Sequence, residues 1–313
     1  MYWPVTPHGK AILACAVGDT LGLPFEYSSR VFDSQNSPLR QLENITWSDD
    51  TQQSLILLDD YLRFQDLDDH RFMRRLVTFR DHPGGNSFGL HRGTGRGFRH
   101  SVNMYSETSR FCPMPGRDGN GAAMRVASVA FALPMDESVI IKINNVNRTT
   151  HDMPNSLHSA EAVVRTVWAV RQGKNGMNAL ESVVDHLPDG QVRQVLTNLA
   201  STSDWKSEIV KDNPAFGPGH GYSLRSPLSA IYIALTCSSI EDAISTALAL
   251  GDDTDSTASI AAAIATGIHP IENLGRELLN FRGCQELLIW DNDKGPEGVD
   301  YLINLEKSLF EIA

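Results

Sequence analysis

The chain has 313 residues, of which 41% are hydrophobic and 21% are charged, a balance that excludes a chain disordered throughout. Its formal net charge of −11 makes nucleic acids and anionic membranes poor partners, because their phosphate groups would be repelled. The four cysteines contain no Cys-x-x-Cys pair, and neither a signal-peptide pattern nor a long apolar stretch is visible, so we expect a cytoplasmic protein without zinc, disulfides or a membrane span.

Helical periodicity recurs along the chain, whereas alternating strand patterns are rare. The small, apolar residues 9–21 predict a tightly packed core helix, and residues 48–64 predict a helix whose apolar side chains share one face. Further helices are expected over 120–132, 156–171, 226–236, 240–249, 254–267 and 297–310. Since no linker or composition shift marks a boundary, we expect a single compact all-α domain over residues 1–313.

Two segments rich in glycine interrupt this pattern. Residues 82–99 contain six glycines, and residues 212–226 contain three glycines and two prolines. Loops of this length inside a compact domain usually form lids or binding loops. We therefore expect both loops to border the same functional cleft.

Two acidic clusters, about two hundred residues apart, carry the strongest chemical signal. Ser48, Asp49 and Asp50 stand where one helix begins, and residues 252–257 (Asp-Asp-Thr-Asp-Ser-Thr) stand where another begins. Ser and Asp are good helix N-caps, and the helix dipole favours an acid in the first turn. Capping needs only one oxygen, however, and neighbouring carboxylates repel one another unless a cation lies between them. The two clusters together therefore indicate a metal site.

The donor atoms indicate which metals fit. All are carboxylate or hydroxyl oxygens, a set that suits Mg²⁺, Mn²⁺ or Ca²⁺ rather than zinc or copper. The sequence contains no twelve-residue calcium-binding loop. The number of acids predicts two ions, about 3.5–4 Å apart.

Five segments in this order resemble the ADP-ribosylglycohydrolases, a family that includes the enzyme that reactivates dinitrogenase reductase. They are residues 18–26 (Gly-Asp-Thr-Leu-Gly-Leu-Pro-Phe-Glu), 47–51 (Trp-Ser-Asp-Asp-Thr), 119–125 (Gly-Asn-Gly-Ala-Ala-Met-Arg), 150–151 (Thr-His) and 251–256 (Gly-Asp-Asp-Thr-Asp-Ser). The chain departs from the family in having Ser at 48 and 256, where Thr is frequent, and Asp252, where Gly is frequent. Serine offers the same hydroxyl oxygen as threonine, so metal ligation is expected to survive.

The resemblance implies roles for individual residues. The implied metal ligands are Ser48, Asp49, Asp50, Asp253, Asp255 and Ser256. The implied catalytic acids are Glu26 and Asp50, either of which could accept a proton from water. The implied ADP-ribose contacts are Asp118, Gly119, Asn120, Gly121 and His151.

The resemblance also implies a reaction. Two divalent cations, Mg²⁺ or Mn²⁺, would serve the hydrolysis of the glycosidic bond between ADP-ribose and a modified target. An ADP-ribosylated protein, modified on arginine, is the expected substrate.

Two other functions are compatible with parts of the sequence. All-α isoprenoid synthases also hold magnesium and a diphosphate between two aspartate-rich motifs, but here neither acidic cluster has the final acid of the usual Asp-Asp-x-x-Asp pattern. A binding protein on the same fold could instead neutralise an ADP-ribosyltransferase toxin by contact. The intact acidic clusters and Glu26 favour retained catalysis, although both roles could coexist.

Overall fold

A computed structural model of the chain describes residues 6–27, 32, 47–83, 87–202, 204 and 222–271. These residues form helices and turns and no β-strand, with an isolated antiparallel bridge between Gly119 and Tyr222. The expectation of an all-α protein is therefore confirmed. No helix in the described ranges is long and apolar enough to cross a membrane. The helix expected over 297–310 lies outside the described residues.

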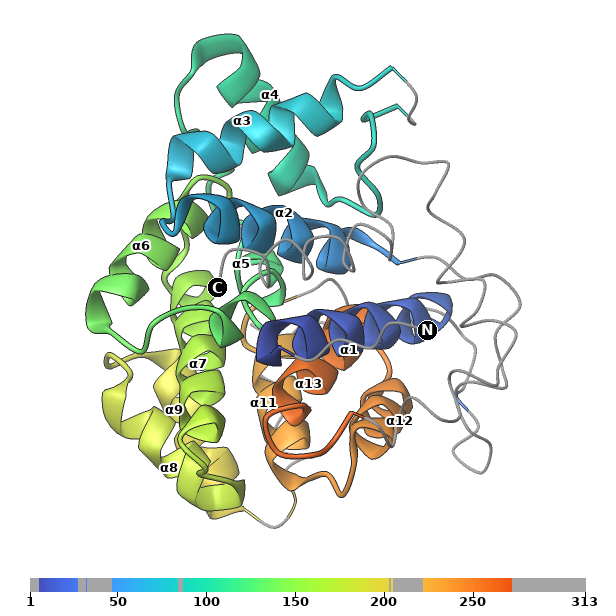
Figure 1. The fold of residues 1–313 in the computed structure, drawn as a ribbon, viewed down its shortest axis with the longest axis vertical. Coiled ribbons are helices and arrows are strands. Elements are labelled where there is room, and N and C mark those ends of the chain that lie inside the picture. Colours follow the sequence, from blue (N-terminus) through green and yellow to red (C-terminus); the bar gives the residue numbers. More distant parts are fainter. Residues whose placement is uncertain are drawn as a thin grey trace.

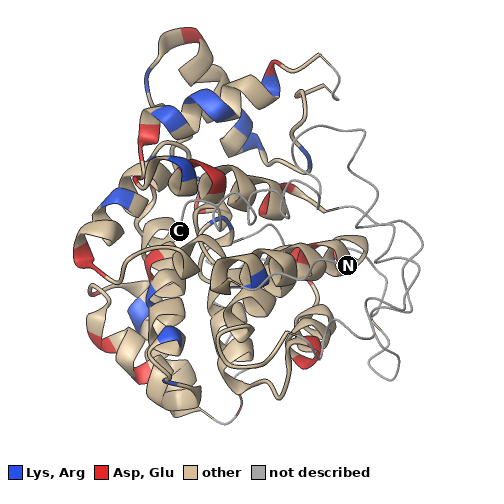
Figure 2. Cartoon of the chain, in the orientation of Figure 1, with Lys and Arg blue, Asp and Glu red and all other residues tan. Residues whose placement is uncertain are grey.

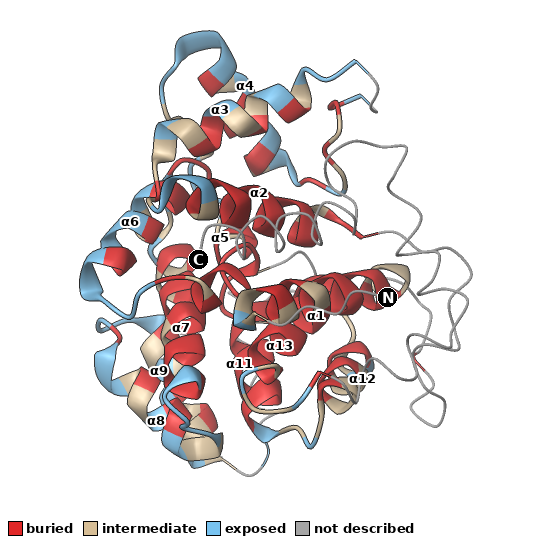
Figure 3. Ribbon diagram, viewed as in Figure 1, coloured by how far each residue is buried: buried red, intermediate tan, exposed pale blue. Residues whose placement is uncertain are grey.

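Helices α1 (Pro7–Gly22) and α13 (Thr254–Ala265) lie side by side at the centre of the fold (Figure 1). Every residue of α13 is buried, as is most of α1 (Figure 3). A Cβ atom added to Gly18 would lie 2.4 Å from the carbonyl oxygen of Ala258, and one added to Gly22 would lie 2.4 Å from the Cα atom of Asp255. The two backbones approach so closely that only glycine fits at these positions.

The remaining helices surround this central pair. Among them, α2 (Asp49–Phe64), α11 (Ser226–Thr236) and α12 (Ile240–Leu250) pack against α1 or α13. A flank on the left of Figure 1 consists of α6 (Glu137–Arg148), α7 (Pro154–Arg171), α8 (Gly176–His186) and α9 (Gln191–Ser201). Helices α3 (Asp69–Arg80) and α4 (Arg96–Thr108) pack together beyond α2, at the top of the view.

Five of these helices were not predicted from the sequence: α3, α4, α6, α8 and α9. They are short surface helices with one buried face and one exposed face (Figure 3). Two begin with an aspartate cap: Asp68 accepts from the N–H of Arg71 at 2.5 Å, and Asp136 from that of Ser138 at 2.7 Å. Because α4 begins at Arg96, the loop expected over 82–99 ends earlier than predicted.

The prediction of one helix over residues 120–132 is largely wrong. Only α5 (Gly121–Met124) is α-helical, and after a series of turns a 3₁₀ segment, η3, covers Val129–Phe131. In a continuing α-helix the carbonyl of Gly121 would accept from the backbone N–H of Arg125. Here it accepts instead from the side-chain Nε of Arg125 at 2.6 Å, while the backbone N–H of Arg125 bonds to Ala123. A buried guanidinium thus replaces the helical hydrogen bond.

Candidate metal centre and active site

The first acidic cluster stands at a helix start that is capped twice. Ser48 is the N-cap of α2, and its Oγ accepts from the N–H of Asp50 at 3.2 Å. A second cap comes from α1, where the buried carboxylate of Asp19 accepts from the N–H of Ser48 at 2.9 Å and from the N–H of Thr51 at 3.0 Å. These two caps satisfy the helix start, so the carboxylates of Asp49 and Asp50 are not needed for capping.

The second cluster stands at the start of α13, and here the acid at the cap position does not cap. The side chain of Asp253 makes no hydrogen bond to its own helix. Its Oδ2 instead accepts from Asn120 Nδ2 at 2.5 Å and from Ser226 Oγ at 2.7 Å. Helix capping therefore does not account for Asp253, which is tied to two segments distant in the sequence.

The fold brings the two clusters into direct contact. Asp50 Oδ1 accepts from Ser259 Oγ at 2.9 Å, across 209 residues of sequence, and its Oδ2 accepts from Ser256 Oγ at 3.3 Å. The hydroxyl of Ser48 lies 3.2 Å from the same Oδ2 atom. Asp50 is thus a buried acid at the junction of α2 and α13, with both oxygens occupied by hydroxyl groups.

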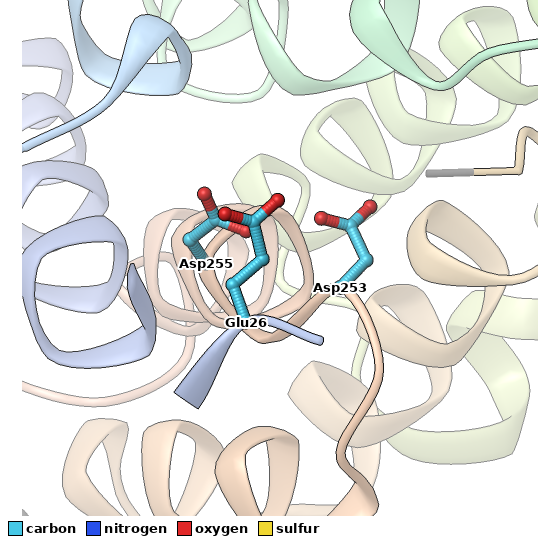
Figure 4. A group of neighbouring side chains, drawn as sticks. All are labelled: Glu26, Asp253 and Asp255. Carbon is cyan, nitrogen blue, oxygen red and sulfur yellow. The ribbon is translucent and has the colours of Figure 1, made fainter. Parts of the chain in front are cut away.

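Glu26 joins this centre from the end of the central helix. It follows η1 (Leu23–Phe25), the short 3₁₀ segment that continues α1. One oxygen from each of Glu26, Asp253 and Asp255 can be chosen so that all three lie within 4.8 Å of one another. Figure 4 shows the three carboxylates on the same side of the α13 start. The close packing of Gly22 on Asp255 sets this placement, and Thr254 Oγ1 reinforces it by donating to the carbonyl of Gly22 at 2.8 Å.

The site concentrates negative charge in a buried place. Burial, with neighbouring carboxylates as the next cause, raises the pKa of Glu26 to about 7 and that of Asp49 to about 7. The same causes raise the pKa of Asp50 and of Asp255 well above the ordinary range. A set of hard oxygen donors that repel one another in this way fits divalent cations, which would relieve the repulsion.

Arg125 is a buried cation beside this acidic set. Its side chain is 0% exposed, and burial lowers its pKa to about 9, although Asp49 and Asp50 favour its charged form. It donates to the carbonyl of Gly121 and, at 3.0 Å, to Thr150 Oγ1. The single positive charge of Arg125 cannot neutralise all the carboxylates of the centre. Further positive charge, such as a bound cation, would therefore be favourable there.

The turn at 118–121 lies against the second cluster through Asn120. Its neighbour Asp118 uses its carboxylate for support: Oδ1 accepts from Ser156 Oγ at 2.9 Å and from Ser223 Oγ at 2.7 Å, and Oδ2 accepts from Asn155 Nδ2 at 2.9 Å. The carbonyl of Gly119 also accepts from Ser156 Oγ, at 2.8 Å. The Asp118 side chain therefore holds the turn on α7.

His151 packs on the same turn. A Cβ atom added to Gly121 would lie 2.6 Å from the imidazole ring of His151. Its Nδ1 faces Thr150 Oγ1 at 2.8 Å and the guanidinium of Arg125 at 3.3 Å. Burial and the Arg125 charge lower the pKa of His151 to about 3, so the ring is neutral. With Nδ1 accepting from Arg125, the ring proton lies on Nε2, which is a donor.

The described parts of both glycine-rich segments reach the centre. A Cβ atom on Gly93 would lie 3.0 Å from Asp49 Oδ1. In the second segment Tyr222 pairs with Gly119, and residues 212–221 lie outside the described ranges.

Several residues of the site were not identified from the sequence. Asp19, Arg125, Ser226 and Ser259 position the acids without a motif that names their role. Two signals were available for Asp19 and Arg125: both lie in segments that resemble the family, and each is a charged residue among small and apolar ones. Asp252, where the resembled family often has glycine, has a φ of 69° and pairs with Arg225 at 3.0 Å.

Known proteins resemble this chain in sequence and in fold. The chain is 25% identical to the ADP-ribosylarginine hydrolase Tri1 of Serratia proteamaculans (strain 568) over 278 residues, which cover 86% of this chain and 73% of the relative. It is 24% identical to the ADP-ribosylhydrolase ARH3 of Xenopus tropicalis over 310 residues, which cover 84% of this chain and 87% of the relative. A solved structure described as an ADP-ribosylglycohydrolase-related protein complex shares the fold, with a TM-score of 0.65 and 19% sequence identity. The match covers 98% of this chain and 97% of the chain in that structure. Because the sequence model of the ADP-ribosylglycohydrolases matches residues 9–288, the chain belongs to that family.

Proposed function

We propose that the hydrolysis of an ADP-ribose linkage, the activity of this family, is directed in this protein at ADP-ribosylated arginine in proteins and requires Mg²⁺ or Mn²⁺ in the cytoplasm. The printed name of the relative Tri1, an ADP-ribosylarginine hydrolase, supports arginine as the target. The convergence of the acidic residues of α2 and α13 on one buried centre is the observation that carries the proposal. Family membership favours this hydrolysis over diphosphate chemistry.

Two ions are proposed, held by the two clusters. The ligands would be Ser48, Asp49, Asp50, Asp253, Asp255 and Ser256. Asp50, Asp253 and Asp255 are buried, and carboxylate oxygens of Asp253 and Asp255 lie within 4.8 Å of each other, which supports cation binding. When bound, the ions would act as Lewis acids toward the ribose hydroxyls and water. The caps from Ser48 and Asp19, and the Asn120 and Ser226 contacts to Asp253, would keep the ligands in place before any ion arrives.

Glu26 is the better candidate for the proton acceptor. Both oxygens of Asp50 accept hydrogen bonds from serine hydroxyls, and its side chain is 2% exposed, so water has little access to it. Glu26 is only half-buried, and its carboxylate has no hydrogen-bond partner among the described residues. A general base must reach the proton that it removes. The difference in access therefore supports Glu26 as the base and Asp50 as a fixed ligand.

The turn at 118–121 and His151 are proposed to hold the ADP-ribose. Glycines let backbone N–H groups approach a phosphate oxygen closely, and the Nε2 proton of a neutral His151 can donate to a phosphate or a hydroxyl. Asn120 connects this turn to Asp253 and would align the bound sugar with the metal ligands. Binding energy from the rest of ADP-ribose would thereby orient the reacting bond.

Release of ADP-ribose from defined substrates tests the proposal. One protein modified on arginine and one modified on serine would be incubated with the enzyme in Mg²⁺, in Mn²⁺ or in excess chelator. We expect release from the arginine-modified protein with either metal and none with chelator. The matched variant Glu26→Gln keeps the size of the side chain and should reduce the turnover number by at least about a hundredfold, as expected for loss of a general base. Equal release in chelator would contradict the metal requirement, and release only from the serine-modified protein would contradict the target.

A further inference from the structure

Positive charge in this acidic chain is concentrated in one region. Residues 69–117 contain nine arginines, no lysine and three acids, a net charge of +6, while the remainder of the chain carries −17. This region contains α3 and α4, and basic positions recur across it at the top of Figure 2. A segregation of this size creates a local field opposite in sign to that of the rest of the molecule.

Three of these arginines, which we call the basic rim, stand at the start of α4: Arg96, Arg99 and Arg117. A Cβ atom on Gly97 would lie 3.7 Å from the Cβ atom of Arg117, which places Arg117 beside the first turn of α4. Arg99 Nε donates to Thr94 Oγ1 at 2.9 Å, and its guanidinium lies over the ring of Phe88, 5.4 Å from the ring centre.

The rim belongs to two segments that each reach the metal centre. Arg96 comes three residues after Gly93, whose added Cβ atom would lie 3.0 Å from Asp49 Oδ1. Arg117 comes directly before the turn at 118–121, in which Asn120 donates to Asp253. The basic rim therefore adjoins the first acidic cluster on one side and the second on the other.

The rim arginines are exposed, and the part of the chain that the structure describes holds no acid paired with them. Three other arginines of the region have acidic partners: Arg71 lies 2.8 Å from Asp60, Arg75 lies 2.6 Å from Asp59, and Arg80 lies 2.6 Å from Asp81. Arg96, Arg99 and Arg117 are exposed, and no ion pair of theirs occurs among the described residues. Like charges held close together repel, and an anionic partner that bound here would relieve this repulsion.

We propose that the basic rim is a docking surface for an acidic stretch of the ADP-ribosylated protein substrate, next to the modified arginine. This inference rests on the proposed function and adds a preference for the sequence around the target. A protein partner fits better than a nucleic acid, because the rim is short and a long polyanion would meet the −17 carried by the remainder of the chain. Exposed charges of this kind affect the association rate and the choice of partner, and their effect weakens as the salt concentration increases.

Two synthetic peptides test the proposal. Both have equal length and carry one ADP-ribosylated arginine, flanked in one by Asp and Glu and in the other by Lys. At low ionic strength we expect wild type to favour the acidic peptide in kcat/KM by about tenfold, and high salt to remove the preference. The double variant R96Q/R117Q should lose the preference yet cleave free ADP-ribosyl-arginine as wild type does. The control K174Q/R193Q changes the net charge equally near α8 and α9, at an exposed lysine and a partly buried arginine across the molecule in Figure 1, and should keep the preference.

Binding of the unmodified acidic peptide, followed by fluorescence anisotropy, gives a readout that does not need turnover. We expect weaker binding by R96Q/R117Q than by K174Q/R193Q. An unchanged peptide preference in R96Q/R117Q would overturn the inference, and so would an equal loss on free ADP-ribosyl-arginine, which would assign the rim to the ADP-ribose itself. Faster cleavage of an ADP-ribosylated oligonucleotide than of the acidic peptide would assign the rim to nucleic acid. Rim-dependent peptide binding without any cleavage would contradict the proposed function alone.

Discussion

The carboxylate of Asp19, on α1, accepts a hydrogen bond at 2.7 Å from the hydroxyl of Thr51, on α2. The same carboxylate accepts from the backbone N–H groups of Ser48 and Thr51, so one helix supplies the cap of another. Burial raises the pKa of Asp19, and the hydrogen bonds from Thr51 and Ser48 oppose that rise. The Asp19 contacts fix the position of the first acidic cluster relative to α1 and hence to Glu26.

Asp19→Ala should destabilise the protein more than the loss of an ordinary helix cap does. It leaves buried N–H groups of Ser48 and Thr51 without an acceptor, and we expect the free energy of unfolding to fall by about 2–4 kcal/mol. The matched control Asp68→Ala removes an ordinary cap from α3 and should cost about 1 kcal/mol. Urea denaturation of both variants measures the difference. Equal losses would mean that the contacts of Asp19 contribute no more than a surface cap.

Asp253→Asn should abolish hydrolysis and leave the fold intact. Asparagine keeps an oxygen that can accept from Asn120 and Ser226, but it removes one negative charge from the set with Glu26 and Asp255. In chelator the variant should melt at the same temperature as wild type or higher, because repulsion is relieved. In Mg²⁺ it should melt lower, because it loses the stabilisation that ligand binding confers. Melting curves in both conditions, beside ADP-ribose release, measure these shifts.

Two results would remove Asp253 from the metal site. One is full activity of the asparagine variant, and the other is a wild-type melting temperature that does not respond to Mg²⁺, Mn²⁺ or chelator. The control Asp189→Asn changes an exposed acid that pairs with Arg193, and it should melt as wild type does in every condition.

Gly22→Ala should destabilise the protein and inactivate it. The new Cβ atom would lie 2.4 Å from the Cα of Asp255, so α1 must move away from α13 and carry Glu26 with it. We expect a loss of at least about 2 kcal/mol in the free energy of unfolding. Gly97→Ala is the control, since its Cβ atom would meet nothing closer than 3.7 Å and alanine is the better helix former. It should stabilise the protein by about 0.5–1 kcal/mol. Equal behaviour of the two variants would contradict the close approach of α1 and α13.

His91 should make stability depend on pH in the acidic range. The ring is 1% exposed, its Nε2 lies 2.8 Å from the carbonyl of Leu76, and burial lowers its pKa to about 4. The unfolded chain, with a histidine pKa of about 6.5, therefore binds more protons than the folded protein between these values. The stabilising effect is fully present above about pH 6.5 and is lost as the pH falls toward 4. Relative to His91→Gln, wild type should lose about 2 kcal/mol between pH 7 and pH 4.5.

Denaturation of wild type and His91→Gln across that pH range isolates the histidine, because the acids of the metal centre contribute equally to both proteins. A difference in unfolding free energy that stays constant with pH would show that His91 titrates alike in the folded and unfolded chain. Repeating the series with His186→Gln, which removes an exposed histidine at the end of α8, controls for the loss of a histidine elsewhere in the chain.

The sequence by itself determined the helical class, most of the central helices and the acids of the centre. Residues 9–21, 226–236 and 254–267 form helices close to their predicted bounds, because small and apolar residues at helical spacing are a local signal. The paired acids of 48–50 and 253–255 were recognisable because their charges conflict with the apolar helices around them.

Tertiary structure decided what each acid does. No local pattern could show that Asp19 caps α2, that Asp253 is held by Asn120 and Ser226, or that Asp50 has both oxygens occupied, since these contacts join residues 27 to 209 positions apart. The early end of α5 involves a local contact, in which the side chain of Arg125 takes the carbonyl of Gly121, but the burial of Arg125 comes from the tertiary structure. Helix periodicity reports which face of a segment is apolar; which polar atoms meet depends on how the helices pack.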